Sequence, residues 1–135
     1  ADNKQVHDLK RRVELINETA PVLAVSIHQN SYPSPDVSGS QIFYFEHSKE
    51  GEEMANTVQK QIENLEGIKN RPIKGNDTYY LLRRTEVPTM IIEGGFLSNQ
   101  EEATRLAEES YQETLAKAIA DGIEECLRSA GSEND

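Results

Sequence analysis

Hydrophobic residues recur at spacings of three and four in three stretches of the chain, the pattern of helices that bury one face. The first stretch predicts a helix over residues 3–17. The second predicts a helix that Ser48 caps and that ends near Gly67. The third predicts a helix that a Ser110–Glu113 capping box opens and that runs to about residue 128, and a Ser98–Glu101 pair predicts a short helix before it. The apolar stripes of the three long helices are Val6, Leu9, Val13 and Ile16; Met54, Val58, Ile62 and Leu65; and Tyr111, Leu115, Ala118, Ile119, Gly122, Ile123 and Cys126.

Short apolar runs lie between these helices and predict strands. Two runs begin after a proline and end on polar groups: residues 21–30, PVLAVSIHQN, and residues 87–93, VPTMIIE. Residues 40–45 predict another strand, the region of Ile73 a brief edge strand, and residues 78–82, TYYLL, a short strand or extended segment. This order of elements predicts the α/β class, as a layered sheet flanked by helices.

The second of these apolar runs ends on a carboxylate, Glu93, which Gly94 and Gly95 follow at once. A buried charge without a partner costs on the order of several kcal/mol, and the two glycines let the backbone turn sharply or approach another group closely. Because sites collect at the carboxyl ends of strands in open α/β sheets, Glu93 is the leading candidate for chemistry. The alternative is a carboxylate that only caps the following turn, and Glu93 taken alone favours this alternative.

A histidine, His28, stands at the end of the other run. If the two strands are parallel neighbours, both side chains emerge at the same rim of the sheet. A single histidine is more often a hydrogen-bonded core or loop residue than a ligand. A histidine and a glutamate at the matching ends of two buried strands are less common, and this pairing favours a functional site. Neutral imidazole is a common zinc ligand, and a nearby carboxylate can act as the base for a metal-bound water.

For the other polar residues near these runs, the sequence supports a functional role less strongly than for Glu93 and His28. The loop after His28, over residues 29–39, could form a rim of the site or be a solvated connection. Arg83 and Arg84 precede the central strand and could either reach into a site or face water, and water is the expected surroundings. His7 and His47 lie outside both runs and receive no role, and His47 is expected in an exposed loop.

Composition and charge narrow the classes of function. With 135 residues the chain is one domain or part of one, and its net charge of −10 argues against nucleic acid and against anionic membranes as partners. No apolar run is long enough to cross a bilayer, and the chain as given carries no export signal. The single cysteine, Cys126, excludes an internal disulfide and a site of paired cysteines, and its helical stripe indicates a buried core thiol.

The motifs SIHQN at residues 26–30 and IIEGGFLSN at residues 91–99 resemble those of the zinc-dependent N-acetylmuramoyl-L-alanine amidases of the type 3 family. Further features follow in the family's order: the helix containing RRVELIN, the strand GSQIFY, the approach YYLLRRTEVP and the closing helix YQETLAKAIADGI. The segments SIHQNSYP and FYF are most similar to the sequences of the spore-cortex branch of this family. The resemblance predicts that residues 1–129 are the C-terminal part of one amidase catalytic domain, and the composition of residues 130–135 predicts a disordered tail.

The resemblance implies hydrolysis of the amide bond between the lactyl group of N-acetylmuramic acid and the L-alanine of the peptidoglycan stem peptide. His28 falls on the family's second histidine zinc ligand, and Glu93 falls on its catalytic glutamate. The implied mechanism is attack by a zinc-activated water whose proton Glu93 takes and returns to the leaving amine. The implied location is outside the cytoplasm, in the cell wall or the spore cortex.

The chain departs from the family pattern in its first part. Neither the strand with the first zinc histidine, in a DPGHGG-like turn, nor the glutamate ligand has a counterpart, so His28 is the one ligand retained. Because zinc sites take three or more protein ligands, we expect the isolated chain to be metal-free and inactive and the parent protein to be an amidase. We also expect an exposed sheet edge that favours self-association.

Two other readings of the sequence stay open. The first is a non-catalytic binding or scaffold domain that keeps the amidase fold without the metal. The second is a hydrolase that uses a pair of carboxylates without metal, which has little support because no second strand-end carboxylate accompanies Glu93.

Overall fold

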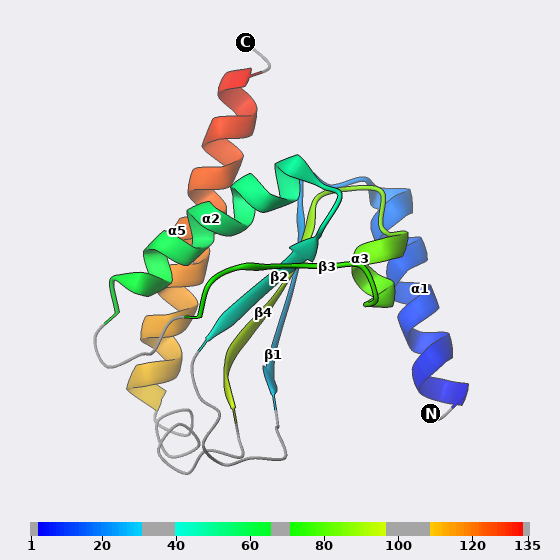
Figure 1. Ribbon diagram of the computed structural model, residues 1–135, viewed down its shortest axis with the longest axis horizontal. Coiled ribbons are helices and arrows are strands. Elements are labelled where there is room, and N and C mark those ends of the chain that lie inside the picture. The colour runs from blue at the N-terminus through cyan, green and yellow to red at the C-terminus, as the bar shows by residue number, and fades with distance from the viewer. Residues whose placement is uncertain (1–2, 31–39, 66–70, 97–108, 134–135) are drawn as a thin grey trace.

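The computed structural model describes residues 3–30, 40–65, 71–96 and 109–133, which form a sheet with helices on both faces (Figure 1). This architecture confirms the predicted α/β layered class. The elements in chain order are α1 (Asn3–Thr19), β1 (Ala24–Asn30), β2 (Gln41–Phe45), α2 (Lys49–Glu63), β3 (Lys74–Asn76), α3 (Tyr80–Arg84), β4 (Thr89–Phe96) and α5 (Glu109–Glu133).

The four described strands form one mixed sheet in the order β1-β4-β2-β3. β4 lies between β1, to which it is parallel, and β2, to which it is antiparallel, and β3 is parallel to β2. The two apolar runs that end on polar groups are therefore parallel neighbours. This neighbour relation is the condition on which the predicted site depended.

The larger core lies between the sheet and the pair α2 and α5, which run side by side on one face (Figure 1). Because successive residues of a strand face opposite sides of a sheet, Ile92 enters this core and Ile91 does not. Ile91 belongs instead to a smaller cluster with Phe43 and Leu82, beneath α3. The larger core is built from Ile42, Met54, Ala55, Val58, Ile62, Met90, Ile92, Leu115, Ala118, Ile119 and Cys126, which confirms the predicted stripes of α2 and α5.

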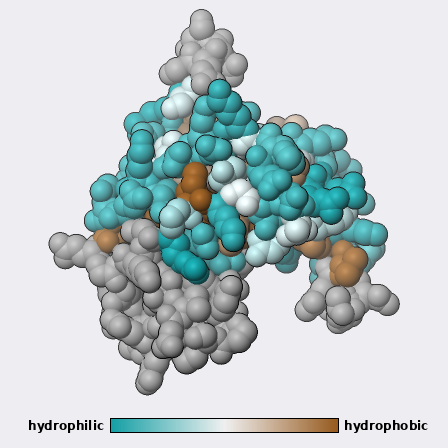
Figure 2. Space-filling view, viewed as in Figure 1, coloured by the Kyte–Doolittle hydropathy of each residue, from teal (hydrophilic) through white to brown (hydrophobic). Residues whose placement is uncertain are grey.

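The outer surface over α2 and α3 is largely hydrophilic, and hydrophobic residues show there only in small separate patches (Figure 2). The charged side chains of α2, and those of α5 whose burial the structure describes, are exposed or partly exposed, as the helical periodicity requires. Among the helices that the structure describes, none is both long enough and apolar enough to cross a membrane.

The ends of the long helices agree only in part with the predictions. Ser48 caps α2 as predicted, since its Oγ accepts a hydrogen bond from the backbone N–H of Gly51 at 2.9 Å. Ser110 lies inside α5, which already begins at Glu109.

The predicted disordered tail is wrong for residues 130–133, which continue α5, because adding a residue to an existing helix costs little compared with starting one. The predictions for Gly67, for the helix after Ser98 and for most of the loop after His28 lie outside the described residues.

The prediction of a short strand or extended segment at residues 78–82 is wrong, because the short helix α3 begins at Tyr80. The side chain of Asn76 accepts hydrogen bonds from the backbone N–H groups of Thr78 (3.0 Å) and Tyr79 (2.8 Å), which turns the chain directly after β3. The ring of Tyr79 then packs edge-on against Phe43, with the ring centroids 5.4 Å apart. The strand preference of tyrosine is weak, and this local turn overrides it.

Gly122 sets how closely α5 approaches α2. A Cβ atom at this position would lie 2.8 Å from the Cα of Val58, a buried backbone atom that cannot move aside alone. We expect Gly122→Ala to lower the free energy of unfolding by about 1–3 kcal/mol, because overpacking outweighs the gain in helix propensity. Urea denaturation followed by circular dichroism measures the change.

Gly131 is the matched control, since it also lies in α5 but a Cβ atom there would meet nothing within 4 Å. Gly131→Ala should raise stability by about 0.5–1 kcal/mol. Equal effects of the two substitutions would show that contact with Val58 does not limit the packing of α5.

Cys126 is the buried core thiol that the sequence predicts, 3% exposed, with its Sγ 3.6 Å from the backbone oxygen of Met54. Burial raises the pKa of this thiol above its ordinary value of 9.0, and the negative charge of Glu125 raises it further. The folded state therefore disfavours the thiolate, so the stability that the thiol contributes is present below pH 9 and is lost as the pH rises above it.

We expect the stability of the wild-type chain relative to Cys126→Ala to decrease as the pH rises from 8 to above 9, which urea denaturation at each pH measures. The native thiol should also react with a disulfide reagent about a hundredfold more slowly than the thiol of the urea-unfolded chain. Equal rates for the native and unfolded thiols would contradict its assignment to the core.

Candidate active site at the carboxyl ends of β1 and β4

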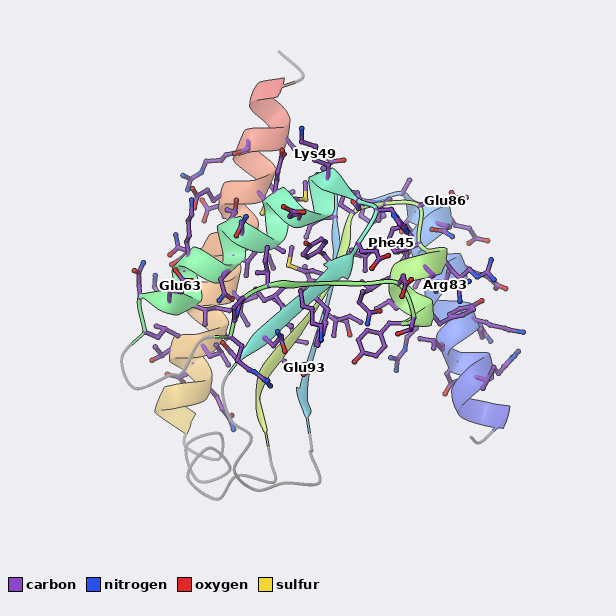
Figure 3. All side chains as sticks on the ribbon, in the orientation of Figure 1. Phe45, Lys49, Glu63, Arg83, Glu86 and Glu93 are labelled. Atoms are coloured by element: carbon purple, nitrogen blue, oxygen red, sulfur yellow. The ribbon has the colours of Figure 1, made fainter. Side chains whose placement is uncertain are left out.

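The candidate site is a row of three residues across three strands. His28 of β1 and Glu93 of β4 are direct partners in the parallel pair, and Gln41 of β2 is the partner of Glu93 on its other side. The register therefore brings together the two residues that the sequence singles out. Glu93 lies at the end of the sheet opposite Phe45 and Lys49 (Figure 3).

Glu93 is buried, with 2% of its surface exposed. Its neighbour Ile92 belongs to the core under α2 and α5, so alternation places Glu93 on the opposite face, with Ile91 and the cluster beneath α3. A carboxylate in such surroundings is held by its neighbours and shielded from bulk water. Burial of this kind is typical of a group with a chemical role, although structural carboxylates can share it.

The strand does not end at Glu93, which corrects the prediction of a turn at the two glycines. β4 continues through Gly94 and Gly95 to Phe96. His28 pairs with Glu93 but Asn30 pairs with Phe96, so β4 holds one residue more than β1 between these two pairs. The glycine pair therefore lies in a β-bulge, a feature that glycine favours and that often adjoins active sites.

Gln41 is the residue of this row that the sequence reading missed. Its side-chain amide donates a hydrogen bond to the backbone oxygen of Pro72 at 2.8 Å, which ties the start of β2 to the segment before β3. The sequence marks Gln41 only as a polar residue near the start of a strand. Its position beside Glu93 depends on the antiparallel pairing of β2 with β4, which local pattern does not reveal.

The remaining candidates lie away from this row. His47 is exposed and lies against Phe45, at the opposite end of the sheet from Glu93, as expected for a loop residue. His7 is exposed on α1. Arg83 and Arg84 are exposed as predicted, and the guanidinium of Arg84 lies 6.0 Å from the ring centre of Tyr80.

The fit of the described residues to a zinc ion is incomplete. A catalytic zinc site takes three protein ligands and leaves one position for water. Over the parts of the chain that the structure describes, no three His, Cys, Asp or Glu side chains are grouped so that they could hold a metal ion. The row contributes one histidine and one carboxylate, so these residues alone do not make a zinc site.

Comparison with known proteins gives the class of this fold and site. The family model for N-acetylmuramoyl-L-alanine amidase matches residues 1–125. The germination-specific N-acetylmuramoyl-L-alanine amidase of Bacillus subtilis is 40% identical over 121 residues, which are 89% of this chain and 51% of that protein.

Solved structures agree with this match. The CwlD amidase of Clostridioides difficile, in complex with the GerS lipoprotein, superposes with a TM-score of 0.86 at 33% identity, over 96% of this chain and 67% of that one. The amidase AmiC2 of Nostoc punctiforme superposes with a TM-score of 0.81 at 35% identity, over 88% of this chain and 65% of that one. The chain belongs to the N-acetylmuramoyl-L-alanine amidase family, and it spans about half the length of its Bacillus relative.

The zinc content of the purified chain tests the incomplete site. After dialysis against a zinc-containing buffer and then a zinc-free one, we expect far less than one zinc per chain, because a single imidazole does not retain zinc. Elemental analysis against protein concentration measures the ratio. A value near one would contradict this expectation, and loss of that zinc in His28→Ala would then identify His28 as one of its ligands.

Proposed function

We propose that this chain supplies the general base of a peptidoglycan amidase that cleaves the bond between N-acetylmuramic acid and L-alanine. The observation that carries the proposal is the buried Glu93 in register with His28, within a member of the amidase family. Residues in register on neighbouring strands share a face of a sheet, which supports a joint role for the two side chains.

Glu93 acts on the water that attacks the amide. Its carboxylate accepts a proton from the water while the water oxygen bonds to the carbonyl carbon of the lactyl group. The same proton then passes to the alanine nitrogen as the carbon–nitrogen bond breaks. The products are a lactyl carboxylic acid and a free amine, and the acid's proton then passes to the amine to give a carboxylate and an ammonium group. The reaction consumes one water and leaves Glu93 unchanged.

His28 has a separate role in this proposal, as one ligand of a zinc ion. When bound, the zinc supplies a Lewis acid that polarises the substrate carbonyl and lowers the pKa of its water. The described residues do not complete the ligand set, so further ligands must come from outside them. A neutral amide substrate is compatible with the net charge of −10, since no anionic group of the substrate has to approach the carboxylate.

The relatives also suggest where the complete protein acts. The Bacillus relative is specific to germination, and the solved Clostridioides relative is also an amidase. We propose the cell wall or the spore cortex, outside the cytoplasm, as the place of action. The stem peptide and the muramic acid are the substrate groups that the site must recognise.

A non-catalytic binding domain is the second candidate, because the described residues lack a complete set of metal ligands. The two candidates make different predictions for purified muropeptides. A binding domain retains them without change, whereas an amidase releases a free amine from each molecule that it cleaves.

Glu93→Gln in the full-length protein tests the base. We expect kcat to fall by about a hundredfold to ten-thousandfold, because the amide side chain cannot accept the proton from water. Mass spectrometry of muropeptide products and labelling of the new alanine amine measure the turnover. Glu86→Gln, a change to an exposed glutamate before β4, is the matched control and should leave turnover unchanged.

The zinc content of the same variants separates the two proposed roles. Glu93→Gln should keep the metal of the wild-type protein, whereas His28→Ala should lose metal and activity together. Full turnover in Glu93→Gln would remove Glu93 from the mechanism, and an active, fully metallated His28→Ala would remove the ligand assignment.

A further inference from the structure

Gln41 is the third member of the row and lies directly beside the proposed base. It is the antiparallel partner of Glu93, so the Cβ atoms of the two residues are about 5 Å apart on the same face of the sheet. Gln41 is partly exposed, whereas Glu93 is buried. A substrate whose reacting atoms reach the carboxylate of Glu93 therefore lies within reach of the side-chain amide of Gln41.

A hydrogen bond holds the side-chain amide of Gln41 in one orientation. Its Nε2 donates to the backbone oxygen of Pro72 at 2.8 Å, on the side of β2 that faces β3 and not β4. This bond uses Nε2 and leaves the acceptor Oε1 for another group. An acceptor that is already oriented binds a donor without the cost of ordering a free side chain.

The segment that holds Gln41 is itself fixed at two further points. The backbone N–H of Arg71 donates to the oxygen of Ser40 at 3.0 Å, and Nε2 of Gln59 donates to the oxygen of Arg71 at 2.9 Å. Gln59 belongs to α2 and is 5% exposed, so the segment is tied to a packed helix. The amide of Gln41 is therefore anchored to a part of the backbone that is fixed by β2 and α2.

The departure of the alanine nitrogen requires a particular orientation of that nitrogen. In the planar amide, the nitrogen lone pair is delocalised into the carbonyl group. After water attacks, the nitrogen becomes pyramidal, and its lone pair must point toward the proton that Glu93 carries. An oxygen atom that accepts the remaining N–H selects the pyramidal arrangement in which the lone pair faces Glu93.

We propose that Oε1 of Gln41 accepts a hydrogen bond from the N–H of the scissile amide and so directs the nitrogen lone pair toward Glu93. This role rests on the proposed function, because it takes Glu93 as the group that returns the proton. Gln41 forms and breaks no covalent bond, and the proton balance of the hydrolysis is unchanged. The role makes the site selective for a secondary amide, whose nitrogen carries one hydrogen, over an ester, whose oxygen carries none.

An ester analogue of the muropeptide, with oxygen in place of the scissile nitrogen, tests this role in the full-length protein. The analogue keeps the carbonyl group that water attacks and lacks the N–H that Gln41 accepts. Gln41→Met should lower kcat for the amide by about tenfold to a hundredfold with little change in KM, because the hydrogen bond acts after the nitrogen becomes pyramidal. The same substitution should leave kcat for the ester within about twofold of the wild-type value.

Gln59→Met is the matched control, since it removes the other glutamine bond to the same segment but lies outside the row. Among the described residues, the buried Oε1 of Gln59 has no hydrogen-bond partner, so an apolar side chain of similar length is tolerated there. Gln59→Met should change kcat for the amide and for the ester by the same factor. Circular dichroism confirms that the variants are folded, and Gln41→Val, with a side chain that strands favour, replaces Gln41→Met if that variant does not fold.

The comparison of the two substrates can overturn the role of Gln41 in two ways. An equal loss for the amide and the ester in Gln41→Met would assign Gln41 a structural role alone. A loss for the amide alone in both Gln41→Met and Gln59→Met would assign the effect to the segment and not to Oε1 of Gln41.

Glu93→Gln separates a failure of this role from a failure of the proposed function. It should lower kcat for both substrates, because water has to be deprotonated in each case. If kcat falls for neither substrate, the proposed function itself fails. If kcat falls for both and Gln41→Met cleaves the amide as fast as the wild-type protein, only the role of Gln41 fails.

Discussion

The parallel pairing of β1 with β4 is the constraint on which the rest of the structure depends. It sets Glu93 directly opposite His28 and places β4 in the centre of the sheet, where its residues are covered on both faces. A shift of this register by one residue would move Glu93 to the opposite face and Ile92 out of the larger core. The same hydrogen-bond ladder therefore fixes both the core and the candidate site.

The two faces of the sheet differ in the size of their apolar clusters, and the candidate site lies on the face with the smaller cluster. The face under α2 and α5 holds the larger core, in which the close contact between Gly122 and Val58 lets two long helices pack together. The face under α3 holds only a small apolar cluster, and Glu93 lies on this face. A buried carboxylate is tolerated there because the cost of its burial is offset by the larger core on the other side of the same strands.

The sequence alone determined the helical stripes, the Ser48 cap, the two apolar runs and the choice of Glu93 and His28, because each follows from the spacing or chemistry of neighbouring residues. The tertiary structure decided which strands pair, and with them the alignment of His28 with Glu93 and the place of Gln41. It also decided that residues 80–84 form a helix, which follows the turn at Asn76. In the same way it decided that β4 continues beyond Glu93 and contains a bulge at the two glycines. These features depend on contacts between segments that are distant in the sequence or on a single side-chain hydrogen bond, and hydrophobic periodicity reports neither.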